Sequence, residues 1–294
     1  EPSSANQINE PIDFRFLLRE YTSVFSSRAF RQYFIISLFF SMSRYFCSYA
    51  DQYFMVSVTD TYNIFISMNI ISGIAEFSGS PVNYFITRYK GKTACGKILG
   101  PLMVIGIAAN GFLTYETPQV IKYAVIILSS ICYNFGFSGP GFVAENIQPD
   151  ITDVDELITG RRREGVISTF KTFFSKTISS LMGFAVGTAL EWFGYDPAVK
   201  HPTLQSKRTT FGLRLNYAVI PAILAFFCVL SVFRYKMTKY DHETIKRIIK
   251  EKHETGECDI TEIDKKRIEQ IAGHNWEDMW IGRPEVNRKI DDII

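Results

Sequence analysis

Residues 98–115 read ILGPLMVIGIAANGFLTY, a stretch without a single charged side chain. A helix needs roughly 20 mostly apolar residues to cross the ~30 Å hydrocarbon layer of a membrane. Other stretches of the chain have the same character, so we expect six spanning helices, at 33–56, 62–87, 98–115, 119–144, 166–193 and 213–233. Six such helices in succession are improbable in a soluble protein. The sequence therefore predicts an all-α membrane protein, a six-helix transmembrane bundle.

Composition excludes several classes of function. The net charge of +2 over 294 residues gives no reason to expect a nucleic-acid partner. The five cysteines have no CxxC spacing and no histidine cluster beside them, so neither a metal site nor a disulfide framework is expected. All four histidines lie outside the predicted spans, and no nucleophile–base pair or phosphate-binding loop is present. We therefore expect no enzyme and no cofactor.

Charge divides the chain into three parts. We interpret 1–32 as a cytoplasmic linker, 33–236 as the bundle and 237–294 as a cytoplasmic helical tail. Lysine and arginine gather before the first span and in alternate loops, which places both ends of a multi-pass protein of the cell membrane in the cytoplasm. The loop at 195–212 is an exception, because it should be external and yet holds basic residues.

The tail carries a short apolar stripe. Ile245, Ile248 and Ile249 recur at helical spacing among lysine and arginine residues. Such a helix either lies on the membrane surface, packs against the cytoplasmic loops or belongs to a solvated tail.

A few ionisable residues lie at membrane depth, where charge is costly unless it faces a partner or a cavity. Arg44 and Asp51 share one face of the first span, and Glu76 lies near the middle of the second. Arg44 and Asp51 form either a structural ion pair or part of a cavity wall. Glu76 is either a packing salt bridge or a site for a coupling ion or proton.

The fourth and fifth spans add polar positions. Asn134 precedes three glycines and a proline at 136–141, which indicates either a broken helix lining a cavity or ordinary helix packing. In the fifth span, Thr172 and Lys176 share a face, with Lys171 and Ser175 beside them. A small-residue stripe at every fourth position from Ser175 favours close helix packing.

The run DVDELITGRRREG at 153–165 precedes the fifth span. It resembles a cytoplasmic loop of the glycoside–pentoside–hexuronide:cation symporters, the melibiose-permease branch of the major facilitator superfamily. The family pattern there is Asp, then Glu, then Thr-Gly-x-Arg-x-Glu-Gly, and all of it is present. The basic RYKGK at 88–92, the entry to the last span at 212–221 and the start of the tail at 235–245 also resemble this family.

The resemblance implies one half of a twelve-helix fold. Family members bind a sugar between two six-helix bundles and couple its uptake to Na⁺, Li⁺ or H⁺. This chain resembles the C-terminal half, and we expect a missing N-terminal bundle that holds most of the cation-binding carboxylates. Because the chain begins at Glu1 and not at Met, we expect a fragment or the downstream part of a longer polypeptide.

The resemblance also places functional residues. The family's eleventh-helix lysine falls on Lys176. Together with the polar residues above, this predicts a substrate site formed by Lys176, Thr172, Lys171, Ser175, Asn134, Glu76 and Arg44. A polar uncharged residue is usual in the family where Lys171 stands. The charged residues of the motif predict a gate of salt bridges that break as the bundles rock, formed by Asp153, Glu156, Arg162 and Glu164.

The predicted function is therefore secondary active transport. The chain would couple uptake of a sugar or glycoside to Na⁺ or H⁺ by alternating access. The alternative is a non-transporting membrane receptor or scaffold of the same fold, whose tail binds a soluble partner.

Overall fold

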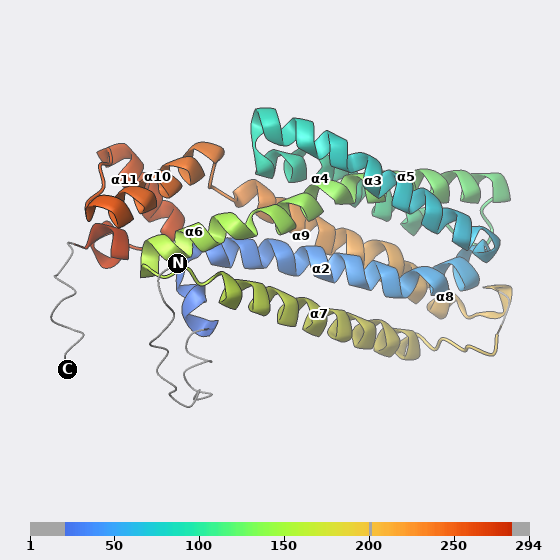
Figure 1. Cartoon of the computed structure of the whole chain (residues 1–294). Helices are drawn as coiled ribbons and strands as arrows, with labels where there is room; N and C mark the ends of the chain where they lie inside the picture. The colour runs from blue at the N-terminus through green and yellow to red at the C-terminus, as the bar shows by residue number, and fades with distance from the viewer. Residues whose placement is uncertain (1–20, 200–201, 284–294) are drawn as a thin grey trace.

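The computed structural model describes residues 21–199 and 202–283, and within these ranges the regular elements are all helical. Six long helical segments run side by side, and shorter helices gather at one end (Figure 1). The long segments are α2 (Arg28–Phe54), α3 (Phe65–Lys90), α4 (Lys92–Ala109), α5 (Gln119–Asn146), α7 (Glu164–Trp192) and the segment that ends in α9 (Ile220–Arg234).

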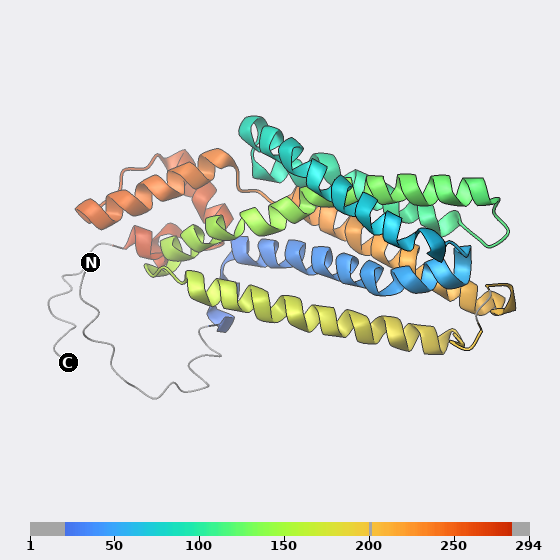
Figure 2. The same ribbon diagram turned by 45° about the vertical axis from the view of Figure 1, so that its right-hand side comes forward.

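Four helical segments in the described part of the chain are long and apolar enough to cross a membrane: Lys92–Phe112, Gln119–Thr159, Glu164–Trp192 and Lys207–Arg234. The helices α2 and α3 run alongside them over a similar length (Figure 2). Both carry charged residues that lower their hydropathy, among them Arg44 in α2 and Glu76 in α3. That α2 and α3 also cross the membrane stays a prediction.

Several helix boundaries differ from those expected. The helix predicted at 33–56 already begins at Arg28, because the hydroxyl of Ser27 caps it by accepting a hydrogen bond from the Phe30 amide at 3.4 Å. The helix predicted at 213–233 is longer and composite. It joins α8 (Lys207–Arg214) to α9 through a π-helical turn at Leu215–Val219.

The glycines of α5 serve helix packing. A Cβ added at Gly136 would lie 2.3 Å from the Met103 amide nitrogen, and one at Gly139 would lie 2.5 Å from the Cys95 carbonyl oxygen. The two backbones of α4 and α5 therefore touch where side chains would hold them apart. The helix packing expected of this segment is confirmed. Because α5 continues unbroken through Pro140, the break expected in the other interpretation is wrong, although Asn134 and Phe137 of the same helix do line a cavity.

The helix α7 is held against α2 by aromatic rings and by hydroxyl pairs. The rings of Phe34 and Phe174 lie 4.3 Å apart. The hydroxyl groups of Tyr45 and Ser175 are 3.0 Å apart, and those of Tyr49 and Ser179 are 2.8 Å apart. The small residues of α7 thus leave room for the tyrosines of α2, as expected of a packing stripe.

The short helices form a cap on one end of the bundle. It consists of α6 (Gln148–Thr159), α10 (Lys239–Thr255), α11 (Glu262–Ala272) and the turns up to Arg283. Ile245, Ile248 and Ile249 are buried here in one core with apolar residues of α6 and α11. Of the three interpretations of this stripe, packing against the segments at the bundle end is confirmed.

Replacing Gly136 with alanine should destabilise the bundle, because the new methyl group would push against the backbone of α4. Overpacking costs about 1–3 kcal/mol, which exceeds the ~1 kcal/mol gained from better helix propensity. The same change at Gly187, where no atom lies within 4 Å, should be neutral or stabilising. Thermal unfolding of the two variants in detergent checks this, and equal midpoints would contradict the close contact.

Candidate functional site

A polar cavity of about 340 Å³ lies among the long helices. Its wall is formed by α2, α3, α4, α5 and the π-helical turn before α9. The polar and aromatic residues that line it are Arg44, Ser48, Asp51, Asn69, Ser72, Glu76, Asn110, Ser129, Ser130, Tyr133, Asn134, Phe137 and Tyr217. Amide, hydroxyl, carboxylate and guanidinium groups thus face one space at the depth of the bundle.

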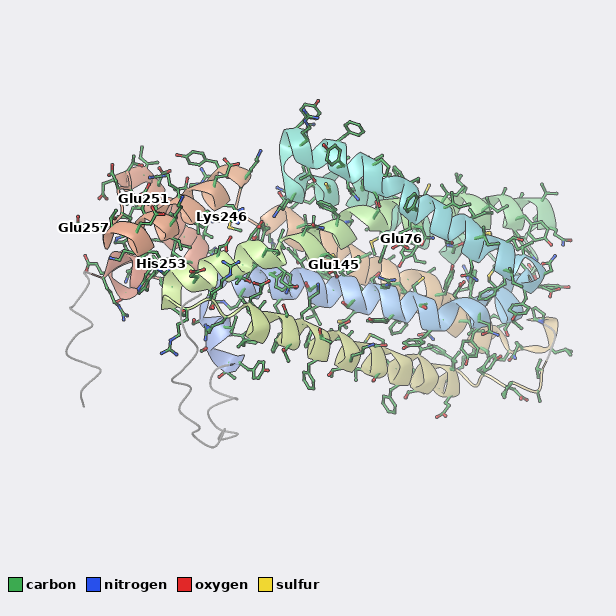
Figure 3. The ribbon with its side chains drawn as sticks, in the orientation of Figure 1. Glu76, Glu145, Lys246, Glu251, His253 and Glu257 are labelled. Carbon is green, nitrogen blue, oxygen red and sulfur yellow. The ribbon has the colours of Figure 1, made fainter. Side chains whose placement is uncertain are left out.

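Three of the predicted substrate residues meet at this cavity: Arg44, Glu76 and Asn134. The guanidinium of Arg44 lies over the Phe137 ring, 5.1 Å from its centre. The Asn134 amide donates to the Ser130 carbonyl at 2.8 Å. Glu76, labelled in Figure 3, has no hydrogen bond or ion pair with any described residue, so its carboxylate is available to a solute.

The ion pair considered for Arg44 and Asp51 is not formed within the described chain, and both side chains line the cavity instead. The hydroxyl groups of Ser72 on α3 and Ser130 on α5 form a hydrogen bond of 2.7 Å in the cavity wall. Sequence reasoning missed Tyr217, because its position depends on a π-helical turn that no simple periodicity reveals. It also missed Tyr133, although this residue directly precedes Asn134.

A second, smaller cavity of about 150 Å³ lies between α2, α5 and α7. It is lined by Lys171 and Ser175, and Arg44 borders both cavities. Lys171 forms an ion pair with Glu145 of α5, which explains how a lysine is accommodated where the family usually has an uncharged residue. These predicted residues therefore lie near the main cavity without lining it.

Thr172 and Lys176 are not brought into either cavity. Both side chains are exposed on α7, and the Thr172 hydroxyl donates to the Ser168 carbonyl at 3.0 Å. Lys176 has no ion pair with any described residue. Their predicted part in substrate binding stays a prediction, one that requires a solute or a partner at the exposed face of α7.

The four predicted gate residues meet in one cluster. Arg162 lies 3.2 Å from a carboxylate oxygen of Asp153, 3.2 Å from one of Glu156 and 3.7 Å from one of Glu164. Asp153 and Glu156 belong to a helix, α6, where a loop was expected. The helix ends at Gly160, whose backbone has a φ of 71° and whose Cα packs against the Trp280 ring of the cap.

Helix α10 supplies a second set of partners to the same carboxylates. A ring nitrogen of His242 lies 2.8 Å from Asp153, and one of His253 lies 3.1 Å from Glu156. His253 and Lys246 of α10 are labelled in Figure 3. Lys246 lies 3.9 Å from Asp153. These three residues stand at i, i+4 and i+11, the same face of a helix. That spacing was the signal by which sequence reasoning could have joined the tail to the charged motif.

The cluster controls the ionisation of Asp153. Burial by itself would raise the pKa of this carboxyl group. The hydrogen bond and charge of His242, with the charges of Lys246 and Arg162, outweigh burial and lower the pKa below its ordinary 3.8. The charged form is thus stabilised in the folded protein. The resulting stabilisation is complete above the unfolded-state pKa and is lost as the pH falls through the lower, folded-state pKa.

Helices suited to crossing a membrane around a polar cavity are typical of a membrane transport protein. Comparison with known proteins gives the family. Residues 15–239 match the model of the MFS/sugar transport protein family, and the chain belongs to that family. It is accordingly a protein of a transporter family and not an enzyme.

Two curated relatives bear the name symporter. An uncharacterized symporter from Synechocystis sp. is 24% identical over 184 residues, which is 62% of this chain and 31% of the relative. An uncharacterized symporter from Bacillus subtilis is 30% identical over 149 residues, which is 50% of this chain and 31% of the relative. The aligned part of the chain thus spans about a third of the length of these relatives.

Replacing Asp153 with asparagine should make the stability of the folded protein less dependent on pH in the acid range, since the variant has no carboxylate to protonate at this site. The unsubstituted chain should lose stability below about pH 4, and the variant should lose less. Unfolding midpoints measured in detergent between neutral and acid pH check this. Glu254→Gln, an exposed position of α10, serves as the control and should keep the original slope.

Proposed function

We propose that the chain is the C-terminal six-helix half of a secondary active transporter that couples uptake of a sugar or glycoside to Na⁺ or H⁺. The observation that carries this proposal is the main cavity, where Arg44, Glu76 and Asn134 face one space inside the bundle. Membership of the sugar transport family and two relatives named symporters support it.

The cavity has the chemistry that a sugar requires. Ligand sites typically enclose about 300–1,000 Å³, and this one lies at the lower end with about 340 Å³. Sugar hydroxyls need donors and acceptors on several sides, which the amides, hydroxyls and carboxylates of the wall provide. The rings of Tyr133 and Phe137 add flat apolar faces for the C–H side of a sugar ring.

Coupling to a cation fits the unpaired carboxylate of Glu76. A carboxylate in this position gains a favourable partner when a cation or a proton enters with the sugar. We assign the larger share of the cation site, together with the second wall of the sugar pathway, to a second six-helix bundle. The exposed face of α7 with Thr172 and Lys176 would then look into the space between the two bundles.

The charged cluster of α6 is proposed as the inner gate, on the cytoplasmic side together with the cap. Arg162 reaches three carboxylates, so a small rotation of α7 against α6 exchanges several ion pairs at once. Sugar and cation bound together would favour the state in which these contacts rearrange.

The direct test is uptake into proteoliposomes that contain this chain with its second bundle. A panel of glycosides, pentoses and uronic acids is offered under an imposed Na⁺ or H⁺ gradient, and accumulation of one of them is expected. The cap offers a folded surface to a soluble protein, which favours a receptor as the second candidate. Sugar binding without flux would support the receptor and contradict the transporter.

Variants of the cavity should separate the two groups of predicted site residues. Arg44→Gln or Glu76→Gln should weaken sugar binding at least tenfold, because each removes a charge-assisted hydrogen bond worth about 1.5–3 kcal/mol. Glu116→Gln, in a loop remote from the cavity, is the matched control and should be silent. Equilibrium binding of the labelled sugar is the measurement.

The same assay decides the role of α7. If the exposed face of this helix borders the pathway, Lys176→Gln should weaken binding only when the second bundle is present. Loss of binding in the Lys176 variant with no effect at Arg44 and Glu76 would place the sugar outside the cavity and contradict the proposed site.

A further inference from the structure

A groove of about 490 Å³ runs along α11 at the bundle end of the cap. It is lined by Lys236, Ile263, Lys266, Arg267, Gln270 and Ile271. A second hollow adjoins it, shares Lys266 and Gln270 with it and extends to Arg28. The surface formed by these two hollows is called the α11 groove below. None of the roles discussed above uses it.

The α11 groove lies next to the ends of the long helices. Arg28 is the first residue of α2, and Lys236 follows α9 by two positions. Lys236 borders one hollow of the groove and Arg28 borders the other, so α11 lies beside the residues at the ends of α9 and α2. In a spanning bundle this is the depth at which lipid headgroups surround the protein.

Cationic side chains without an ion-pair partner in the described chain outnumber the carboxylates that line the groove. Arg28, Lys236 and Lys266 form no ion pair with any described residue. Arg267 is paired with the buried Asp241. Two carboxylates line the second hollow, and both accept hydrogen bonds from neutral donors: Glu269 from the Trp276 amide at 2.7 Å and Asp278 from Asn275 at 3.1 Å. Their two negative charges are fewer than the three unpaired cations, so the groove keeps a net positive charge. An anion would therefore find free cationic groups here.

The same surface also contains an exposed apolar side chain, that of Ile263. Its side chain is 80% exposed at the start of α11, within the groove that Lys236 and Lys266 line. Exposure of an isoleucine side chain to water is unfavourable. The boundary between lipid headgroups and acyl chains accommodates both this side chain and the flanking lysines. Basic groups beside an exposed apolar side chain, next to the end of a spanning helix, are typical of a protein surface that binds an anionic membrane.

We propose that the α11 groove binds the headgroups of anionic phospholipids and so holds the cap against the membrane. Each lysine or arginine close to an anionic bilayer contributes about fivefold to the affinity. Lys236 and Lys266 provide the free charge, and Ile263 enters the headgroup layer between them. The cap that carries the α10 contacts to Asp153 and Glu156 would then respond to the lipid around it.

The test compares the full chain in nanodiscs of phosphatidylcholine with the full chain in nanodiscs that also contain phosphatidylglycerol. Hydrogen–deuterium exchange at the amides of α11 is the measurement, with α10 as an internal reference. Phosphatidylglycerol should slow exchange in α11 at least fivefold, and added salt should reverse the effect because it screens the charges.

The double variant Lys236→Gln/Lys266→Gln should lose this protection. The control Lys250→Gln removes an exposed lysine of α10, outside the groove, and should keep it. Equal exchange of α11 in both lipids would overturn the proposal, as would protection that survives in the double variant or that appears equally in every helix. The readout does not depend on sugar flux, so failure of the proposed transport function would leave it unaffected.

Discussion

Hydrocarbon solvates neither a charged group nor a free backbone amide, and this constraint shapes the bundle. It requires unbroken helices, and it favours charged and polar side chains that face a cavity or a partner, although Thr172 and Lys176 are exposed on α7. Arg44, Asp51 and Glu76 line a shared cavity, whereas Lys171 pairs with Glu145 beside it. The glycine contacts between α4 and α5 serve the same end, because close backbones exclude lipid from the wall behind the cavity.

At the end of the bundle, buried carboxylates are stabilised by cationic partners instead of by a shared cavity. Asp153 and Glu156 are largely buried, and their charges are stabilised by partners from two directions, Arg162 from the turn between α6 and α7 and the histidines of α10. The apolar side of α6 meanwhile packs into the core that includes Ile245 and Ile248. Helix α6 is therefore fixed by charge on one face and by apolar burial on the other, so the cap is joined to the cluster proposed as the gate.

The sequence was informative where one physical rule acts alone. Hydropathy located the long helices, and helical spacing placed Arg44 and Asp51 on one face, which the structure turns to the cavity. Sequence reasoning failed where tertiary contacts determine the position of a residue. Periodicity did not reveal the π-helical turn that positions Tyr217, nor the docking of α10 that brings His242 to Asp153. Glycines at 136–141 suit both a broken helix and a close contact, and only the position of α4 distinguishes the two.

The joint between α5 and α6 has a mechanical consequence. Only Ile147 separates the two helices, and backbone hydrogen bonds cross it from Ile147 to Val143 and from Ile151 to Ile147, each at 3.1 Å. One nearly continuous rod thus carries Asn134 at the cavity and Asp153 in the charged cluster at the end of the bundle. A rigid rod transmits a tilt of one arm to the other, so a displacement of α5 at the cavity would also move Asp153 against the cap.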